Sequence, residues 1–225
     1  MKPLIGIIGR PEKNKEGNSM YGVYYNLASA ITLLGGIPIG IIPPLAIDAY
    51  KKKTSEVECC SEEELESIFE SLDICDGVIL QGGDEFYDFD LKAIDYLKLK
   101  NKPLLGICLG MQTISVNAGA SLYEIKDKTH KSKDDYVHEI YISKDSLLYK
   151  ILNKNRLRVN SKHYSGVLNP TLKISAISED GIIECVEDVT KKFFVGVLWH
   201  PETMISYDED QKKILKYFID ICKKN

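Results

Sequence analysis

The sequence lacks an excess of positive charge and lacks a long uninterrupted apolar run. Its 225 residues include 29 Lys and Arg against 33 Asp and Glu, a formal net charge of -4. This balance offers no basic footprint for a phosphate backbone, so we expect no nucleic-acid partner. The longest apolar run, 37–47, is broken by Pro38, Pro43 and Pro44, and the first ten residues lack the apolar core of a signal peptide. The sequence therefore predicts neither a membrane span nor secretion.

The cysteines lack the C-x-x-C spacing of a metal site. The six occur at positions 59, 60, 75, 108, 185 and 222. This usage predicts free thiols in a reducing, cytoplasmic setting. Adjacent Cys59 and Cys60 could bind a metal or oxidise, but we expect them on a linker before a helix. Because no internal repeat, low-complexity tract or domain linker is found either, we expect one domain over 1–225.

Strand-like and helix-like patterns alternate through the first half of the chain. Short apolar runs typical of buried parallel strands occupy 4–8, 37–42, 76–80 and 104–107. Helical spacing or capping signals mark 21–34, 61–72, 89–100 and a segment that starts near 109. Between the second strand and the second helix, the polar residues 51–60 predict a loop or a short helix.

The second half alternates apolar and polar residues, which predicts half-exposed, partly antiparallel strands. We expect these strands at 136–143, 172–177 and 182–186. A short helix is expected at 145–152, and an amphipathic helix at 208–223 should cover the sheet. The whole pattern predicts an α/β fold with a doubly wound, flavodoxin-like, mostly parallel sheet, flanking helices, and extra antiparallel strands in the C-terminal half.

A glycine-flanked cysteine follows the strand at 104–107. Gly106-Ile-Cys108-Leu-Gly110 has the spacing of a nucleophile elbow, with cysteine in place of serine. A side chain presented on a sharp strand-to-helix turn needs neighbours without Cβ, because the backbones approach closely. The amide dipoles of the following helix favour a thiolate, which is the attacking form. The alternative is a buried, inert core cysteine beside a glycine-rich turn.

Two further clusters complete a site. Gly82 and Gly83 follow a predicted parallel strand, at the sheet edge where ligands bind in open α/β sheets. Their amides, with the amide of Leu109, could stabilise an oxyanion; a plain strand-to-helix turn is the alternative. His200 and Glu202 follow the apolar run that begins at Phe193. A cysteine nucleophile needs such a base and an acceptor that orients it.

These motifs resemble the class I glutamine amidotransferases, and within them the gamma-glutamyl-gamma-aminobutyrate hydrolase branch. Residues 106–112, Gly-x-Cys-x-Gly-x-Gln, match the nucleophile motif, and 196–202, Gly-Val-Leu-Trp-His-Pro-Glu, match the motif of the histidine and glutamate. Residues 159–163, Val-Asn-Ser-Lys-His, resemble the branch's Val-Asn-Ser-x-His, and 179–184 resemble its Asp-Gly-x-x-Glu turn. The resemblance runs nearly end to end.

The resemblance implies that Cys108 attacks a gamma-glutamyl amide while His200 shuttles the proton and Glu202 orients His200. A thioester forms, an amine or ammonia leaves, and water releases glutamate. It also implies two further groups of site residues, an oxyanion hole and a set of substrate contacts. These are Gly83 and Leu109 for the oxyanion, and Gln112, His163 and Tyr164 for the substrate. No metal or cofactor is implied, because this chemistry needs only a thiolate, an imidazole and amide dipoles.

The sequence departs from the branch in three places. The branch carries a third glycine and an Asp-Pro pair after its glycine loop, where this chain reads Gly82-Gly83-Asp84-Glu85-Phe86, and the stretch from there to the elbow is shorter. Tyr164 and Ser165 replace a second His and a Gln. Because the glycine loop would border the leaving group, the amine specificity is left open. His138 resembles a recurrent His of the branch but is expected to be structural, and His130, in the charged run 126–135, is expected in solvent.

Three functions stay open from the sequence. The first is a stand-alone gamma-glutamyl amide hydrolase acting on a small molecule. The second is a glutaminase subunit that delivers ammonia to a synthetase partner, which the compact glycine loop favours. The third is a non-catalytic or redox-sensing protein that uses Cys108 as a reactive thiol, although a sensor needs neither His200 nor Glu202. For each of these functions, the sequence leaves open whether the protein forms a homodimer.

Overall fold

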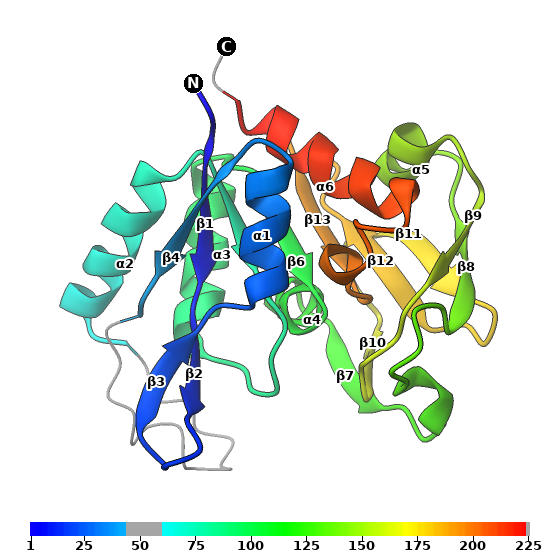
Figure 1. The fold of residues 1–225 in the computed structure, drawn as a ribbon, viewed down its shortest axis with the longest axis horizontal. Coiled ribbons are helices and arrows are strands. Elements are labelled where there is room, and N and C mark those ends of the chain that lie inside the picture. Colours follow the sequence, from blue (N-terminus) through cyan, green and yellow to red (C-terminus); the bar gives the residue numbers. More distant parts are fainter. Residues whose placement is uncertain (44–59, 224–225) are drawn as a thin grey trace.

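A nine-stranded sheet crosses the protein (Figure 1); the computed structural model describes residues 1–43 and 60–223. The strand order is β4-β1-β5-β6-β13-β12-β11-β8-β9. The parallel part comprises β4 (Ile37–Ile41), β1 (Leu4–Ile8), β5 (Gly77–Leu80), β6 (Leu104–Ile107) and β13 (Phe194–Val197). The antiparallel part comprises β12 (Ile183–Glu187), β11 (Lys173–Ser178), β8 (His138–Ile142) and β9 (Arg156–Val159).

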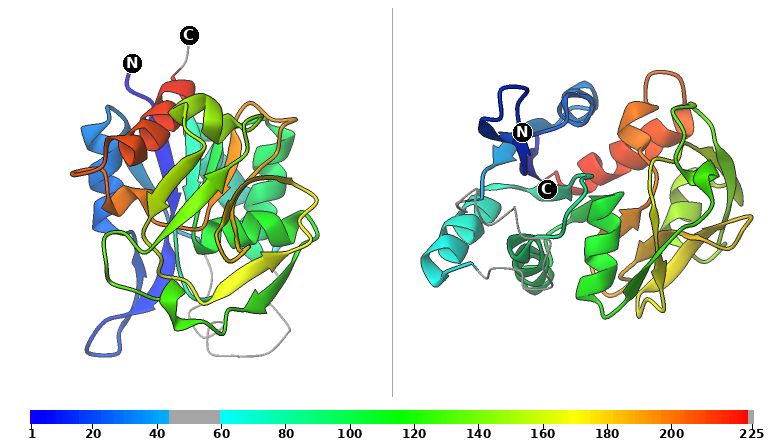
Figure 2. Two further views of the ribbon diagram at one scale, coloured as in Figure 1. Left: turned by 90° about the vertical axis from the view of Figure 1, so that its right-hand side faces the viewer. Right: turned by 90° about the horizontal axis from the view of Figure 1, so that it is seen from below.

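Helices cover both faces of this sheet (Figures 1 and 2). On one face lie α1 (Tyr25–Leu33), α5 (Leu147–Leu152) and α6 (Glu209–Ile221). On the other face lie α2 (Glu62–Ile74), α3 (Asp88–Leu99) and α4 (Leu109–Asn117). The predicted doubly wound fold with added antiparallel strands is therefore confirmed, and the order of its parallel strands is that of flavodoxin-like sheets.

The parallel strands are apolar throughout because their side chains pack into two different cores, one on each face of the sheet. In β1, Ile5 and Ile7 pack with α1 and α6, whereas Ile8 packs with α2 and α3. In β5, Ile79 joins the first core and Leu80 the second. Each such side chain contributes about 1.5–3 kcal/mol of burial free energy. Continuous apolar runs, rather than alternation, are the expected signature of strands covered on both faces.

Local signals set several helix ends as predicted. Ser61 caps α2 in a capping box, in which its hydroxyl accepts from the Glu64 amide at 3.2 Å and the Glu64 carboxylate accepts from the Ser61 amide at 2.8 Å. Asp208 caps α6 by accepting from two amides of the first turn. Among the described residues, no helix is long and apolar enough to cross a membrane.

The start of α1 was predicted four residues too early. Residues 19–22 form β3 (Ser19–Gly22), which pairs with β2 (Arg10–Lys13) in a hairpin that the periodicity did not indicate. The hairpin turn is closed by the Asn14 side chain, which accepts from the amides of Glu16 and Asn18. Such an Asn-based turn competes with helix formation.

Two other expectations also need correction. β12 was expected to be half-exposed, but its residues 184–187 are buried, because it lies inside the sheet between β11 and β13. A small ribbon of β7 (Ser121–Glu124) and β10 (Ser165–Leu168) was not predicted. Residues 51–59 of the predicted loop, which include Cys59, fall outside the described residues. Cys60 is described: it is buried and donates its backbone amide to Asp88.

Candidate active site

Three neighbouring parallel strands, β5, β6 and β13, end at one edge of the sheet. Gly82 and Gly83 follow the first, Cys108 follows the second, and His200 follows the third. Since parallel strands present their carboxyl ends together, segments far apart in sequence converge here. The structure thus brings the elbow, the glycine loop and the His-Pro-Glu motif to one place.

Cys108 occupies the strained turn that the glycine pattern predicts. Its backbone has φ 53° and ψ -107°, a conformation that costs a non-glycine residue on the order of 1–3 kcal/mol. A Cβ on Gly106 would lie 2.6 Å from the Gly110 carbonyl, and a Cβ on Gly110 would lie 2.1 Å from the Leu80 oxygen. Both glycines are therefore required for α4 to begin directly after Cys108 and to pack against β5.

His200 and Glu202 form a close pair. His200 Nδ1 lies 2.8 Å from Glu202 Oε1, and the carboxylate is placed by the short 3-10 helix η3 (Pro201–Thr203). Burial opposes a charged imidazole, but the Glu202 carboxylate and hydrogen bonding with Cys108 outweigh it and raise the pKa of His200 to about 10. The ring therefore holds a proton near neutral pH and faces the Cys108 side chain.

Asn160 holds the backbone of His200, a role that sequence reasoning missed. Its Nδ2 donates to the His200 carbonyl at 3.0 Å, and its Oδ1 accepts from the His200 amide at 2.9 Å. Asn160 Nδ2 also donates to Thr203 Oγ1, which itself donates to the His200 carbonyl. Asn160 is buried. The Val-Asn-Ser-x-His motif was a signal for this position, but only its His was assigned a role.

The glycine loop lies next to the side chains of Cys108 and His200. A Cβ on Gly82 would lie 3.1 Å from His200 Cε1 and 3.7 Å from Cys108 Cβ. A Cβ on Gly83 would lie 3.0 Å from Leu109 Cδ2, so the two predicted oxyanion residues are neighbours. A side chain at either glycine would require these neighbours to shift.

A buried ion pair between Arg10 and Asp90 supports the glycine loop. The guanidinium of Arg10 contacts the carboxylate of Asp90, and its Nη2 donates to the Gln81 carbonyl at 2.9 Å. Gln81 in turn accepts from the Tyr24 amide at 3.0 Å and donates to the Ile8 carbonyl at 3.0 Å. This polar network joins β1, the glycine loop and the start of α1. Nothing in the local sequence pattern pointed to it.

A cavity of about 310 Å³ opens over Cys108. This volume is at the small end of ligand sites and suits a small molecule. Its walls carry one exposed cation, one carboxylate outside the Glu202 pair, and several polar side chains. The lining residues are Tyr24, Asn26, Gly83, Asp84, Cys108, Lys162, His200, Glu202 and Thr203.

The three residues predicted to contact the substrate do not line this cavity. Gln112 is buried and donates its amide to the Ser165 carbonyl at 2.7 Å. His163 is buried with its Nε2 2.9 Å from Ser161 Oγ, and Tyr164 is half exposed with Lys131 over its ring. None of the three is among the described residues that line the cavity. Lys162, the residue directly before His163, does line the cavity.

The expectation that His130 is in solvent is wrong. Only 3% of it is exposed, and its Nε2 lies 2.8 Å from Asp180 Oδ2. The charged run around His130 misled the prediction, because the 3-10 turn η2 (Lys128–His130) directs this one residue inward. His130 instead joins His138 and His163, whose rings lie 4.7 and 5.1 Å from its own.

Known proteins are similar to this chain in fold and in sequence. A putative GMP synthase protein from Thermoplasma acidophilum superposes with a TM-score of 0.67 at 18% identity, covering 98% of this chain and 94% of that one, which shows the fold. A gamma-glutamyl-gamma-aminobutyrate hydrolase, PuuD, from Escherichia coli is 27% identical over 98% of this chain and 94% of its own length. A putative glutamine amidotransferase, PB2B2.05, from Schizosaccharomyces pombe is 33% identical over 66% of this chain and 70% of its own.

These relatives, together with the fold, define a cysteine-type amidohydrolase of the glutamine amidotransferase-like class. The Peptidase C26 family pattern matches residues 87–202, which is more than half of the chain. The chain therefore belongs to the Peptidase C26 family. The resemblance stated from the sequence motifs is confirmed at this level.

Proposed function

We propose that this protein hydrolyses a gamma-glutamyl amide of a small molecule through a Cys108–His200–Glu202 triad. The observation that carries the proposal is the His200–Glu202 contact of 2.8 Å, with the same imidazole packed against a cysteine on a strained elbow. A merely structural cysteine needs neither the strain nor the base.

In the proposed reaction, the Cys108 thiolate attacks the amide carbon, and the electron pair of the carbonyl moves to its oxygen. The amides of Gly83 and Leu109 stabilise this oxyanion. His200 gives its proton to the leaving nitrogen as the C–N bond breaks and a thioester remains. His200 then takes a proton from water, which attacks the thioester, and glutamate and the thiolate are released. Glu202 keeps the imidazole oriented throughout.

We propose that the charged cavity walls recognise the glutamyl end of the substrate. Lys162 and Asp84 carry opposite charges in the lining, which suits the carboxylate and the ammonium of an α-amino acid group. The substrate roles of Gln112, His163 and Tyr164 stay predictions, because these residues are not among the described residues that line the cavity.

The test is glutamate release from glutamine, gamma-glutamyl-aminobutyrate, gamma-glutamyl-putrescine and a gamma-glutamyl anilide, with Cys108→Ser as the control. Turnover of a substituted amide above glutamine, lost in the control, supports a stand-alone hydrolase and begins to identify the amine. If none of the four substrates releases glutamate while Cys108 is still readily alkylated, the result counts against a stand-alone hydrolase. Glutamate release that requires a synthetase partner would support the glutaminase-subunit alternative.

We also propose a cytoplasmic location. Four of the described cysteines are free thiols, at positions 75, 108, 185 and 222. Free thiols persist in reducing compartments. Fractionation of cells that express the tagged protein tests this, and recovery from an oxidising compartment would contradict it.

A further inference from the structure

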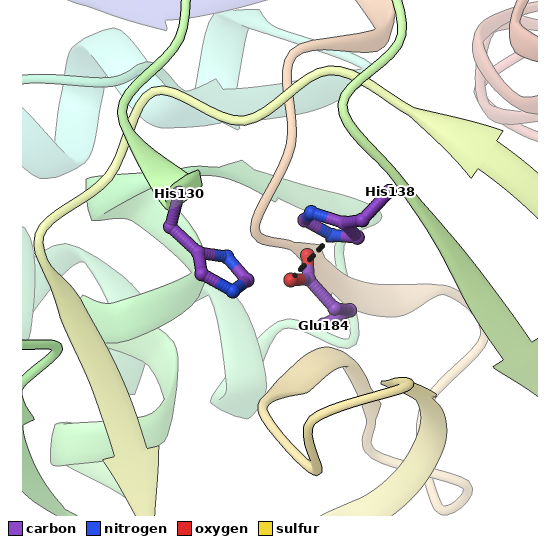
Figure 3. A group of neighbouring side chains, drawn as sticks. All are labelled: His130, His138 and Glu184. Atoms are coloured by element: carbon purple, nitrogen blue, oxygen red, sulfur yellow. Dashed lines mark ion pairs between the residues drawn. The ribbon is translucent and has the colours of Figure 1, made fainter. Parts of the chain in front are cut away.

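Three polar side chains from distant segments converge on the side of the molecule that carries β8 and β12 (Figure 3). His130 comes from η2, His138 begins β8, and Glu184 lies in β12. One ligand atom of each, a ring nitrogen or a carboxylate oxygen, lies within 4.8 Å of the others. His138 Nε2 is 3.0 Å from Glu184 Oε1. The mechanism proposed above uses none of these residues.

Glu184 and His138 approach each other without a hydrogen bond of good geometry. Glu184 is completely buried, the His138 side chain is 14% exposed, and their contact is the 3.0 Å approach of His138 Nε2 to Glu184 Oε1. Among the described residues, the Glu184 oxygens and the His138 ring nitrogens have no hydrogen-bond partner of good geometry. A buried carboxylate is costly unless it pairs with a charge or coordinates a metal.

The chemistry of the side chains suits a cation. Imidazole nitrogens and a carboxylate oxygen are a donor set that zinc-type ions accept.

A second layer of contacts orients the potential ligands. Asp180 Oδ2 lies 2.8 Å from His130 Nε2, the carboxylate–histidine arrangement that commonly backs a metal ligand. His163 Nε2 lies 3.7 Å from Glu184 Oε1 and is a further donor within reach. Ser161 Oγ lies 2.9 Å from that nitrogen.

We propose that His130, His138 and Glu184 bind one divalent transition-metal ion of the zinc class. Nitrogen donors distinguish this site from calcium or magnesium sites, which take oxygen ligands.

The ion would brace the candidate active site without touching substrate. Asn160, which holds His200, is joined to the cluster through the next residue, Ser161, whose hydroxyl contacts His130. The Leu198 amide donates to the Glu184 carbonyl at 2.8 Å, two residues before His200. Fixing Glu184 and the 160–163 segment therefore fixes both supports of His200. The site thus has a positioning role.

The experiment uses the full chain with Cys108→Ser, which removes the catalytic thiol as a competing ligand. After chelator treatment, the protein is dialysed against Zn²⁺ and, separately, against Co²⁺. We expect one Zn²⁺ per chain and a visible spectrum of tetrahedral Co²⁺ without the near-ultraviolet charge-transfer band of a thiolate ligand.

Variants locate the site. Glu184→Gln and His138→Asn should lose stoichiometric binding, and Asp180→Asn should weaken it about 10- to 100-fold. Asp180 is in an exposed turn and its side chain is 47% exposed, so this variant decides the matter if the buried variants fail to fold. His200→Asn changes the histidine that belongs neither to the cluster nor to its neighbours, and it should keep the ion.

Three results would overturn the proposal. Substoichiometric Zn²⁺ in the parent protein would leave the cluster as a proton-sharing histidine–carboxylate network. A thiolate band would place the metal on cysteines. Binding unchanged in folded Asp180→Asn and Glu184→Gln would place it elsewhere.

Discussion

The side chain of Asn160 holds the backbone of His200 from both sides. It donates to the carbonyl at 3.0 Å and accepts from the amide at 2.9 Å, so the residue that carries the imidazole cannot rotate freely. Because His200, at φ -113° and ψ 78°, lies between β13 and η3, no regular structure would otherwise fix it. The base of the proposed triad is thus positioned by a residue that touches neither substrate nor thiol.

Replacing Asn160 should therefore damage catalysis more than folding. We expect Asn160→Ala to lower kcat on the order of 100-fold, the cost of a misplaced catalytic group. The loss of its hydrogen bonds should reduce the free energy of unfolding by about 1–3 kcal/mol. Glutamate release and urea denaturation measure the two effects. Asn155→Ala, at an exposed position, is the matched control, and equal kcat in the two variants would contradict the role.

Removing the carboxylate should lower the pKa of His200. Since the Glu202 charge is the largest cause that raises this pKa to about 10, Glu202→Gln should bring it down toward the ordinary value near 6.5. Imidazole resonances followed by NMR across pH 5–11 measure the shift. A pKa of His200 that does not move would show that Glu202 is not its partner.

The same pKa predicts how stability changes with pH. A folded-state pKa above the unfolded value stabilises the fold fully below about pH 6.5, and this contribution disappears as the pH rises through about 10. Wild-type protein should therefore lose, relative to Glu202→Gln, on the order of a few kcal/mol of unfolding free energy over that window. Urea denaturation at intervals from pH 6 to 10 tests it; parallel curves for the two proteins would refute it.

The elbow should not tolerate a methyl group at Gly110. The added carbon would meet the Leu80 backbone oxygen at 2.1 Å, and backbone cannot move aside as a flexible side chain can. We expect Gly110→Ala to destabilise the protein by about 1–3 kcal/mol or more, as overpacking does. Gly40→Ala is the control, because its nearest contact would be 3.8 Å. Thermal denaturation should separate the two variants clearly.

Breaking the ion pair beneath the glycine loop should be costly. Asp90→Asn leaves the buried Arg10 charge without its partner, and such changes cost about 3–5 kcal/mol. Asp220→Asn breaks an exposed pair with Lys216 on α6 and should cost less than about 1 kcal/mol. Denaturant midpoints of the two variants give the comparison. Similar values would mean that the buried pair contributes little.

Lys162 should affect substrate binding rather than the chemical step. Loss of a charge-assisted contact to a carboxylate costs about 1.5–3 kcal/mol, so Lys162→Ala should raise KM about tenfold or more while kcat changes little. Lys133→Ala, on the exposed run before β8, should leave KM unchanged. A fall in kcat alone would move Lys162 out of the binding role.

The sequence was most informative where a short stretch determines its own geometry. The glycines at 106 and 110 predicted the elbow at Cys108, and Ser61 with Glu64 predicted the start of α2; both rest on contacts within a few residues or on one close backbone approach. The parallel strands were found because their apolar runs require burial on both faces.

What was missed depends on contacts between distant segments. Asn160 contacts a backbone forty positions later, and Arg10 pairs with Asp90 across the sheet, so neither carries a local pattern. His130 was misplaced because its charged neighbours are solvent-exposed while one turn directs its ring inward. Strand β12 was judged from alternation alone, which cannot show that a sheet continues on both of its edges.

The position of β13 has a consequence for the newly made chain. This late strand lies between β6 and β12, so the middle of the sheet closes only after most of the protein has been synthesised. Cys108 is made much earlier, and the strand that leads to the proposed base, His200, is the one that joins the two halves. A chain interrupted before residue 194 would carry the thiol without His200 or Glu202. Under the proposed mechanism, Cys108 therefore gains its base only with the strand that joins the two halves of the sheet.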